Sequence, residues 1–331
     1  MNEPIDIVYL WCDGSEPAVR AKRERRAAEL GIACGGKDNG ACRYRDNGEL
    51  RFSLRSVCRF APWIRNVFVV LDDDQTPPAW LDLGNPRLRI VRHSEILPPE
   101  SLPCFASRTI EFGIPRIPDL SERFLYANDD MYIARPVKPS LFFASDGSPV
   151  CRYLRTRIEL SKISEPSAYM ISICNNARFI RERVVPETAG AKVPPSQELP
   201  PHHNIDSYRK STLLDFAARF PEDLGRTLRY AFRDGRQLQR EVWSSYALAL
   251  GKGRFRFAKR PWYEQLFTGC RHESLIIQVG QGFRRRFERA RPYLFCFNDN
   301  PEATQEDIDD VRRFLLELFP EACEFENPKG A

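Results

Sequence analysis

Short apolar runs alternate with amphipathic segments through the first 140 residues of the chain. The runs are rich in β-branched and aromatic side chains and stop at polar turns, which is typical of buried strands. The segments between them are rich in helix formers or carry apolar side chains at helical spacing. We expect strands at 5–11, 67–72, 88–93 and 123–129, and helices at 18–30, 47–61 and 105–117. Strands that alternate with helices in this way favour a mostly parallel α/β sheet flanked by helices.

The pattern changes after residue 140. An Asp-Gly pair lies between two apolar runs at 140–154, which predicts a hairpin. Prolines and polar turn formers crowd 188–203, which predicts a loop. Further helices are expected at 207–220, 241–251 and 304–319, and a late strand at 291–299. We therefore divide the chain into an α/β core over 1–140 and a second part over 141–331, whose hairpin and helices pack on the core and whose last strand and helix complete it.

Composition is ordinary for a globular chain of 331 residues, with 42% apolar and 29% charged residues. No apolar run approaches the ~20 residues of a membrane span, and the N-terminus does not resemble a secretory signal. Ten cysteines are scattered singly without a CxxC pair, so we expect reduced thiols, a cytoplasmic location and no zinc site. Cys34 and Cys42 flank a Gly-rich loop, and pairing or metal binding by these two is an alternative.

Basic residues slightly outnumber acidic ones, 50 to 45, which gives a net charge of +5. This excess suits phosphate-bearing or polyanionic ligands or an anionic membrane face, and we expect no nucleic-acid partner. The basic tracts 20–26 and 283–292 could meet an anionic membrane, as in peripheral association, or a charged polymer. A solvated surface explains each tract more simply.

Acidic and amide side chains follow three of the expected strands. Asp13 comes after the first strand, Asp129 and Asp130 after the fourth, and Asn298 with Asp299 after the last. Ligands of open α/β sheets bind beyond the carboxyl ends of the strands. Hard oxygen ligands there suit Mg²⁺ or Mn²⁺, which would offset the repulsion between adjacent carboxylates. The alternative is that one of the paired aspartates only caps a turn.

Histidine is scarce, and two of the four histidines, His202 and His203, stand together in the Pro-rich loop. A loop histidine with a pKa near neutrality is a natural general base. Without support from other residues, a surface pair in a flexible loop is the simpler explanation.

Arginine is abundant near strand ends and helix starts, as at Arg43, Arg108 and Arg233. The guanidinium fork is well suited to phosphate. Asn47, Arg51 and Arg55 are four apart, so they share one polar face of the helix expected at 47–61. That face could hold a diphosphate or could be an exposed charged stripe.

Several stretches resemble the conserved blocks of the Stealth family, in the right order over about residues 5–326. They are "IDIVYLWCDGSEP", "RDNGELRFSLRSVCRFAPWIRNVFVVLDDDQTPPAWL", "SRTIEFGIPRIPDLSERFLYANDDMYIARP", "HHNIDSYRKSTLLDFAARFPEDL" and "FCFNDN". The family contains bacterial capsular polysaccharide phosphotransferases and the animal N-acetylglucosamine-1-phosphotransferase. The resemblance implies a Rossmann-like or GT-A-like fold and a nucleotide-sugar-binding core over 1–140.

The resemblance also implies a reaction. Family members take a UDP-linked amino sugar, transfer the sugar-1-phosphate to a hydroxyl and release UMP, which forms a phosphodiester. For this chain it implies a UDP-sugar donor, a glycan or polysaccharide acceptor, Mg²⁺ or Mn²⁺, and a role in cell-surface or capsular polysaccharide synthesis. Such chemistry uses a metal, arginines on the phosphoryl oxygens and a base for the acceptor proton.

The roles carry over residue by residue. Asp129, Asp130 and Asn298 match metal-ligand positions, with Asp130 also catalytic. His203, seven residues before Lys210, matches the base, and Arg233, 12 residues after Pro221, matches a functional arginine. Two of the expected substrate contacts have an alternative: Glu111 could support a neighbouring contact instead of touching substrate, and His202 could exchange roles with His203. The full set of expected substrate contacts is Asp13, Gly14, Asn47, Arg51, Arg55, Ser107, Arg108, Glu111 and His202.

Two other functions stay open at this point. A metal-dependent glycosyltransferase would use the same donor and release UDP instead of UMP. A non-catalytic sugar- or phosphate-binding module would show no turnover of any UDP-sugar.

Overall fold

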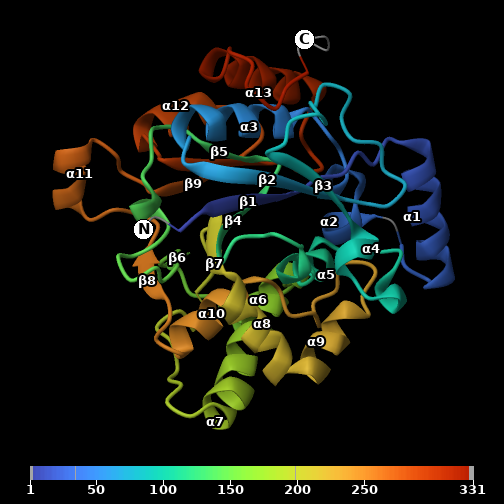
Figure 1. Cartoon of the computed structure of the whole chain (residues 1–331), viewed down its shortest axis with the longest axis vertical. Helices are drawn as coiled ribbons and strands as arrows, with labels where there is room; N and C mark the ends of the chain where they lie inside the picture. The colour runs from blue at the N-terminus through green and yellow to red at the C-terminus, as the bar shows by residue number, and fades with distance from the viewer. Residues whose placement is uncertain (1–2, 34, 198, 328–331) are drawn as a thin grey trace.

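A five-stranded sheet lies at the centre of the molecule, in the strand order β3-β2-β1-β4-β7. The computed structural model describes residues 3–33, 35–197 and 199–327. Helices α3, α12 and α13 lie on one side of the sheets, and α5, α6, α8, α9 and α10 lie on the other (Figure 1). A second sheet, β5-β10-β9, continues from the end of β4, and β6 and β8 form a separate pair. The α/β class with a mostly parallel sheet flanked by helices is thus confirmed.

Within the described residues, the strands are β1 (Ile5–Leu10), β2 (Ile64–Leu71), β3 (Leu88–Arg92), β4 (Arg123–Asn128), β5 (Met131–Ile133), β6 (Val150–Tyr153), β7 (Asp206–Arg209), β8 (Arg254–Phe257), β9 (Ser274–Gln278) and β10 (Leu294–Asn298). The helices are α1 (Pro17–Glu29), α2 (Gly36–Asn39), α3 (Glu49–Phe60), α4 (His93–Ile96), α5 (Ser107–Glu111), α6 (Ala168–Phe179), α7 (Val185–Glu187), α8 (Lys210–Arg219), α9 (Pro221–Leu228), α10 (Glu241–Ala249), α11 (Trp262–Thr268), α12 (Phe283–Ala290) and α13 (Gln305–Leu318).

Strand β1 is buried on both faces, and its side chains divide between two cores. Ile7 and Tyr9 pack in the core that contains Leu50 and Leu54 of α3. Val8 points the other way, into the core formed with α8 and α10. Successive strand side chains point to opposite faces, so a strand covered on both sides reads as a continuous apolar run.

The strand directions bring distant segments to one edge of the sheet. β1 and β4 are parallel, so both end at this edge. β5 follows β4 directly and pairs antiparallel with β10, so Asn298 at the end of β10 arrives beside Asp130. β7 is antiparallel to β4, so the loop before β7, which contains His203, reaches the same edge.

The long helices follow the sequence pattern closely. α3 buries Leu50, Leu54 and Val57, as their spacing predicts. α13 begins with the expected capping box, in which Thr304 and Asp307 each accept a hydrogen bond from the other's backbone N–H. Favourable caps of this kind are worth roughly 1 kcal/mol.

Several predicted elements were wrong in detail. The segment 105–117 breaks into α5 and a 3-10 turn, because Gly113 and Pro115 interrupt it. The expected hairpin at 140–154 contains a tight turn and one antiparallel bridge, but β6 pairs parallel with β8. The helix expected at 207–220 begins at Lys210, because residues before it form β7. α2 occupies part of the loop expected at 31–42.

Nine of the cysteines are described, and all nine are free thiols; Cys34 lies outside the described residues, so its pairing with Cys42 is untested. In the part of the chain that the structure describes, every helix is too short or too polar to traverse a lipid bilayer.

Candidate functional site

A cleft lies where β1, β4 and β10 end, and it has two adjoining lobes. The first lobe encloses about 200 Å³ and is bordered by the residues that follow these three strands. The second lobe encloses about 680 Å³ and extends toward α6 and the segment 154–163. Both lobes share six lining residues: Arg43, Ser107, Asn128, His203, Arg233 and Asn298. The edge of the sheet therefore forms the cleft that the strand ends predict.

The predicted metal ligands Asp129, Asp130 and Asn298 all line the first lobe, together with Glu49 of α3. Burial and the neighbouring carboxylates of Glu49 and Asp130 raise the pKa of Asp129 well above its usual range. Burial likewise raises the pKa of Asp130 to about 6 and, with repulsion from Asp46, that of Glu49 to about 7. These carboxylates form an acidic pole, which we define as Glu49, Asp129 and Asp130.

Glu49 was missed by the sequence analysis. It lies in the segment 45–50 with three other polar residues, and the only available signal was its place two residues after Asn47. Asn47 donates to both Glu49 oxygens, from its backbone N at 2.6 Å and its side-chain amide at 2.7 Å. Asn47 therefore holds a member of the acidic pole, and it does not line either lobe.

The acidic pole fits a hard divalent cation. Asp130 Oδ1 is buried without a hydrogen-bond partner, and its other oxygen accepts only a weak bond from Cys296 Sγ at 3.4 Å. No three His, Cys, Asp or Glu side chains among the described residues already surround a single point. Mg²⁺ is commonly held by one or two carboxylates with substrate phosphates and water, so the two aspartates that line the first lobe fit an ion that would enter with a phosphate-bearing ligand.

Cationic side chains form the opposite pole of the cleft, which we define as Arg43, Arg108 and Arg233. Arg108 is buried and donates to Ser172 Oγ at 2.9 Å and to a backbone carbonyl, while Arg233 donates to Ser107 Oγ at 3.1 Å. Burial lowers the pKa of Arg108 to about 10, helped by Arg233, and burial with repulsion from Arg43 lowers that of Arg233. The hydrogen-bond partners of Arg108 and Arg233 are thus neutral groups.

His203 lines both lobes, whereas His202 lines neither. The backbone φ of His203 is +46°, a left-handed conformation that non-glycine residues seldom adopt. Burial and the Arg240 guanidinium lower its pKa to about 3, so the imidazole is neutral and has a free lone pair at pH 7. His203, and not its neighbour, is therefore placed to accept a proton in the cleft.

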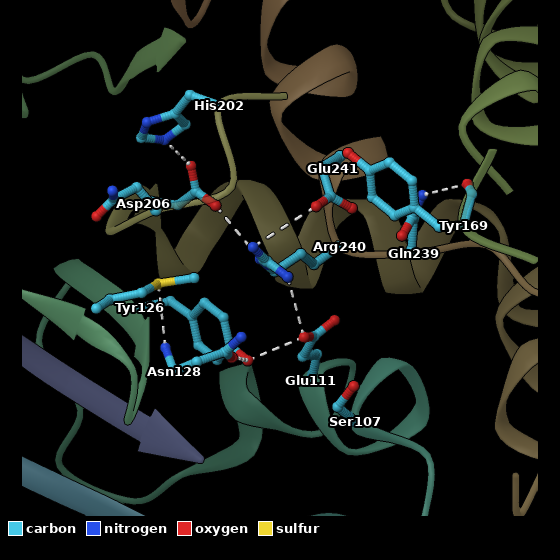
Figure 2. A network of polar contacts seen from close by, with 12 residues as sticks. Ser107, Glu111, Tyr126, Asn128, Tyr169, His202, Asp206, Gln239, Arg240 and Glu241 are labelled. Carbon is cyan, nitrogen blue, oxygen red and sulfur yellow. Dashed lines mark hydrogen bonds and ion pairs between the residues drawn. The ribbon is translucent and has the colours of Figure 1, made fainter. Parts of the chain in front are cut away.

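A continuous set of polar contacts backs the cleft (Figure 2). Arg240 lies at its centre, donating to Asp206 Oδ2 at 3.3 Å and to Glu111 Oε1 at 3.1 Å, with Glu241 at 3.6 Å. Asp206 Oδ1 forms a hydrogen bond with His202 Nε2, at a distance of 2.8 Å. The Arg240 network, as we call it, consists of Glu111, Tyr126, Asn128, His202, Asp206, Arg240 and Glu241.

The other end of the Arg240 network reaches the strand that carries the aspartates. The Tyr126 hydroxyl lies 2.9 Å from Glu111 Oε1 and 2.7 Å from Asn128 Oδ1. Glu111 was predicted to contact substrate, but its described contacts are with the network, although it also borders the second lobe. Arg240 and Asp206 were missed: Asp206 stands in the quoted stretch that begins at His202 but was given no role, Arg240 stands in no quoted stretch, and only the fold brings the two together.

Arg51 and Arg55 are corrected by the structure. Both lie on one face of α3, as their spacing predicts, but each donates to Glu326 at 2.5 Å and neither lines the cleft. Arg55 also donates to the backbone carbonyl of Phe319. The C-terminal segment thus occupies the face that was expected to hold a diphosphate.

Asp13 and Gly14 follow β1 and take different positions. Asp13 Oδ1 accepts from the backbone N and hydroxyl of Ser15, so this carboxylate stabilises its own turn and does not line the cleft. Gly14 does line it. A Cβ at Gly14 would lie 2.5 Å from Tyr44 Cβ, which leaves room only for glycine at this close approach.

An acidic pole, a cationic pole and a neutral histidine at the strand ends of an α/β sheet define a cleft suited to a metal and a phosphate-bearing ligand. Residues 43–151 match the model of Stealth protein CR2, conserved region 2. The chain thus carries this conserved region of the Stealth family, as its resemblance implies.

Curated relatives extend this match over nearly the whole chain. The exopolysaccharide phosphotransferase CpsY of Mycobacterium leprae is 35% identical over 327 residues, which cover 96% of this chain and 56% of that protein. An exopolysaccharide phosphotransferase of Streptomyces coelicolor is 34% identical over 335 residues, covering 98% of this chain and 57% of that protein. The chain therefore spans a little over half the length of these relatives.

Among solved structures, the chain is similar to the galactosyltransferase LgtC in complex with donor and acceptor sugar analogs. The TM-score is 0.41, with 12% sequence identity and 96% of each chain covered. A likeness this weak carries no argument about function.

Proposed function

We propose that this chain transfers a sugar-1-phosphate from a UDP-sugar to a hydroxyl of a glycan acceptor, releases UMP and forms a phosphodiester in polysaccharide synthesis. One observation carries the proposal: one cleft is lined by the carboxylates of Asp129 and Asp130 and by the guanidinium groups of Arg108 and Arg233, whose hydrogen-bond partners are neutral groups. Uncompensated buried charges cost several kcal/mol, so both poles favour a ligand that neutralises them. A divalent cation with a nucleotide diphosphate is such a ligand.

The relatives support this choice of chemistry, because both bear the name exopolysaccharide phosphotransferase. We infer that the donor is a UDP-linked N-acetylhexosamine, as family resemblance implies, and that Mg²⁺ or Mn²⁺ is required. The residues that would hold the ion are Asp129, Asp130 and Asn298. A bound divalent cation would stabilise the charge that develops on the diphosphate and on the departing UMP.

The described side chains supply the remaining roles. His203 accepts the proton of the acceptor hydroxyl, and its pKa rises toward neutrality when an anionic diphosphate enters the cleft beside it. The hydroxyl oxygen forms a bond to the β-phosphorus, the bond from that phosphorus to the bridging oxygen breaks, and the electron pair leaves with UMP. Arg233 and Arg108 hold the phosphoryl oxygens during this displacement.

Product analysis tests the proposal. The protein is incubated with a panel of UDP-sugars, Mg²⁺ and bacterial glycan fragments, and nucleotides are separated by chromatography. UMP that depends on Mg²⁺ and is absent with His203→Ala supports the proposal. UDP in its place indicates a glycosyltransferase. Binding of UDP-sugars without any nucleotide release across the panel indicates a non-catalytic module.

A further inference from the structure

Helix α11 projects from the body of the molecule (Figure 1). Trp262, Tyr263, Leu266 and Phe267 are exposed by 73, 52, 74 and 89%, respectively. These four side chains are adjacent on a helix of seven residues, and they are among the most exposed large hydrophobic residues in the described part of the chain. Single exposed apolar side chains are normal, whereas a contiguous cluster marks an interaction surface.

A short stem holds α11 in place. Lys259 and His272 form an antiparallel bridge, and the backbone N of Arg260 donates to the carbonyl of Arg271 at 3.1 Å. The backbone N of Arg271 donates in turn to the carbonyl of Ala290, at the end of α12. Both ends of the excursion are thus fixed to the body, and α11 is not a free tail.

The stem also fixes which face of α11 points outward. Arg260 Nη1 donates to Glu264 Oε2 at 2.9 Å, and the Gln265 amide donates to the carbonyl of Arg260 at 2.7 Å. The polar side of α11 therefore faces the stem. The apolar residues stand at positions i, i+1, i+4 and i+5, which share the opposite side of a helix.

Exposed cations lie on the stem and at the end of α11. Lys259, Arg271 and Arg291 are exposed, and the Arg291 guanidinium lies beside Gly269 at the end of α11. The two carboxylates of the stem region do not offset these charges: Glu264 is paired with Arg260, and Glu273 with Arg152, Arg256 and Arg260. We define the α11 patch as the four apolar side chains with Lys259, Arg271 and Arg291.

Helix α12 extends the positive charge behind the stem. Arg285, Arg286 and Arg289 are exposed on it, against one exposed acidic residue, Glu288. An anionic surface that reaches α12 as well as α11 would also meet exposed cations of α12. Each Lys or Arg near an anionic bilayer contributes about 1 kcal/mol to binding.

We propose that the α11 patch binds the surface of an anionic lipid bilayer, with the aromatic and aliphatic side chains inserted at the interface and the cations on the headgroups. Trp and Tyr are favoured at the interface, and Leu and Phe add buried apolar area. A second copy of the chain fits the patch less well. A stable protein interface uses about 20–30 residues from each partner, and two copies would bring like charges together.

Vesicle binding tests the proposal. The purified chain is mixed with phosphatidylcholine vesicles with or without 30% phosphatidylglycerol, and binding is measured by flotation and by tryptophan emission. Trp262 is exposed by 73%, whereas Trp11 and Trp243 are buried and Trp63 and Trp80 are half-buried, so insertion of α11 should shift the emission to shorter wavelength, and this shift should be lost when Trp262 is replaced. We expect binding to the anionic vesicles, and a loss of at least ~10-fold in affinity for Trp262→Ser/Phe267→Ser and for Lys259→Glu/Arg271→Glu.

A matched variant controls for general loss of surface hydrophobicity. Leu83→Ser/Val193→Ser removes two side chains that are exposed by 59 and 52% elsewhere, and it should bind as the unchanged chain does. Circular dichroism checks that each variant is folded. The proposal is overturned if the unchanged chain does not float with anionic vesicles, or if it binds neutral vesicles equally well. It is also overturned if Trp262→Ser/Phe267→Ser leaves vesicle binding intact and instead abolishes a dimer seen by light scattering.

Discussion

Two neighbouring regions of this molecule are dense in buried charge, and they differ in how that charge is balanced. In the Arg240 network, the guanidinium is surrounded by Asp206, Glu111 and Glu241, and each contact is within the protein. In the cleft, Arg108 and Arg233 donate to neutral groups, and among the described contacts neither forms an ion pair with Glu49, Asp129 or Asp130. Arg240 thus has three acidic partners, whereas the described carboxylates of the acidic pole have no cationic hydrogen-bond partner. The two regions adjoin, since Glu111, Arg240 and Glu241 also line the second lobe, and burial still raises the pKa of Glu241 to about 7.

This difference distinguishes residues that stabilise the fold from residues that are available to bind a ligand. The pKa of Asp206 is lowered by His202 and Arg240 despite its burial, as expected of a carboxylate with cationic partners. Burial and like charges instead raise the pKa of Asp129 and Asp130. Groups that are destabilised in the free protein gain most from a ligand, so perturbed but unpaired charges indicate the binding site.

The largest effect is expected at the histidine. His203→Ala removes the proton acceptor and should lower kcat by about 10²–10⁴-fold with little change in unfolding free energy. His202→Asn, which keeps a polar group near Asp206, should lower kcat far less. Rates of UMP release for both variants provide the measurement, and equal losses would show that the two histidines are wrongly assigned.

A substitution in the Arg240 network should act mainly on the stability of the folded chain. Arg240→Met leaves Asp206, Glu111 and Glu241 buried without their cation, and it should lower the free energy of unfolding by about 3–5 kcal/mol. Urea denaturation measures this change. Arg236→Met is the control, because Arg236 is 76% exposed beside Asp234 and should change stability by less than about 1 kcal/mol. Similar stabilities for the two variants would contradict the role given to Arg240.

A substitution in the cationic pole should lower activity without lowering stability. Arg233→Met removes a like charge near Arg108 and Arg43, so stability should be unchanged or higher, while kcat/KM falls about 10²–10³-fold through loss of phosphoryl contacts. Denaturation and kinetics on the same sample check both halves. A destabilised Arg233→Met would place this residue with the supporting network.

The sequence predicted elements whose stability is local and missed those that depend on a partner strand. The spacing of apolar residues predicts both α3 and α13, and the capping residues predict the start of α13. β7 has only four residues, "DSYR", and becomes a strand because β4 is beside it. The spacing of Arg51 and Arg55 correctly gave one shared face but could not show that Glu326, 271 residues beyond Arg55, would occupy it.

The candidate site divides in the same way. The residues at strand ends, Asp130 and Asn298, were predictable because parallel strands end at one edge. Choosing His203 over His202 depended on the family resemblance, and the structure places only His203 in the cleft. Arg240 could not be found, since its partners Glu111 and Asp206 are distant in sequence, whereas Glu49 had only the weak signal of its place two residues after Asn47.

The acidic pole predicts an unusual dependence of stability on pH. The folded-state pKa of Asp130 is about 6 and that of Glu49 about 7, above the usual values for carboxyl groups. Asp130 and Glu49 therefore bind more protons in the folded than in the unfolded chain between about pH 4 and 7, and the stability contributed by these two groups is lost as pH rises through that window. The lowered pKa of His93 and His203 acts in the opposite direction, so the contribution of a carboxyl group is measured in EDTA, from pH 5 to pH 7.5, as the difference in unfolding free energy between the unchanged chain and a variant of that group.

Asp130→Asn should flatten this dependence and add about 1–3 kcal/mol to stability at pH 7.5, because one pKa unit corresponds to about 1.4 kcal/mol. Mg²⁺ should stabilise the unchanged chain at pH 7.5 and not the variant. Asp119→Asn, at an exposed carboxylate, controls for removal of a surface charge and should leave the pH dependence unchanged. An unchanged pH profile for Asp130→Asn would show that the pKa of this carboxyl group is not raised in the folded chain.

The smallest effect is expected on the far face of α3. Arg51 is partly exposed, and its partner Glu326 also accepts hydrogen bonds from Arg55 and from the backbone N of Cys323. Because Glu326 keeps these partners, Arg51→Met should lower the free energy of unfolding by no more than about 1 kcal/mol. Since Arg51 lies outside the cleft, KM for the UDP-sugar should equal that of the unchanged chain, whereas a diphosphate contact would raise KM at least tenfold. Measuring KM and stability together therefore decides whether Arg51 only stabilises the fold through Glu326 or contacts the substrate.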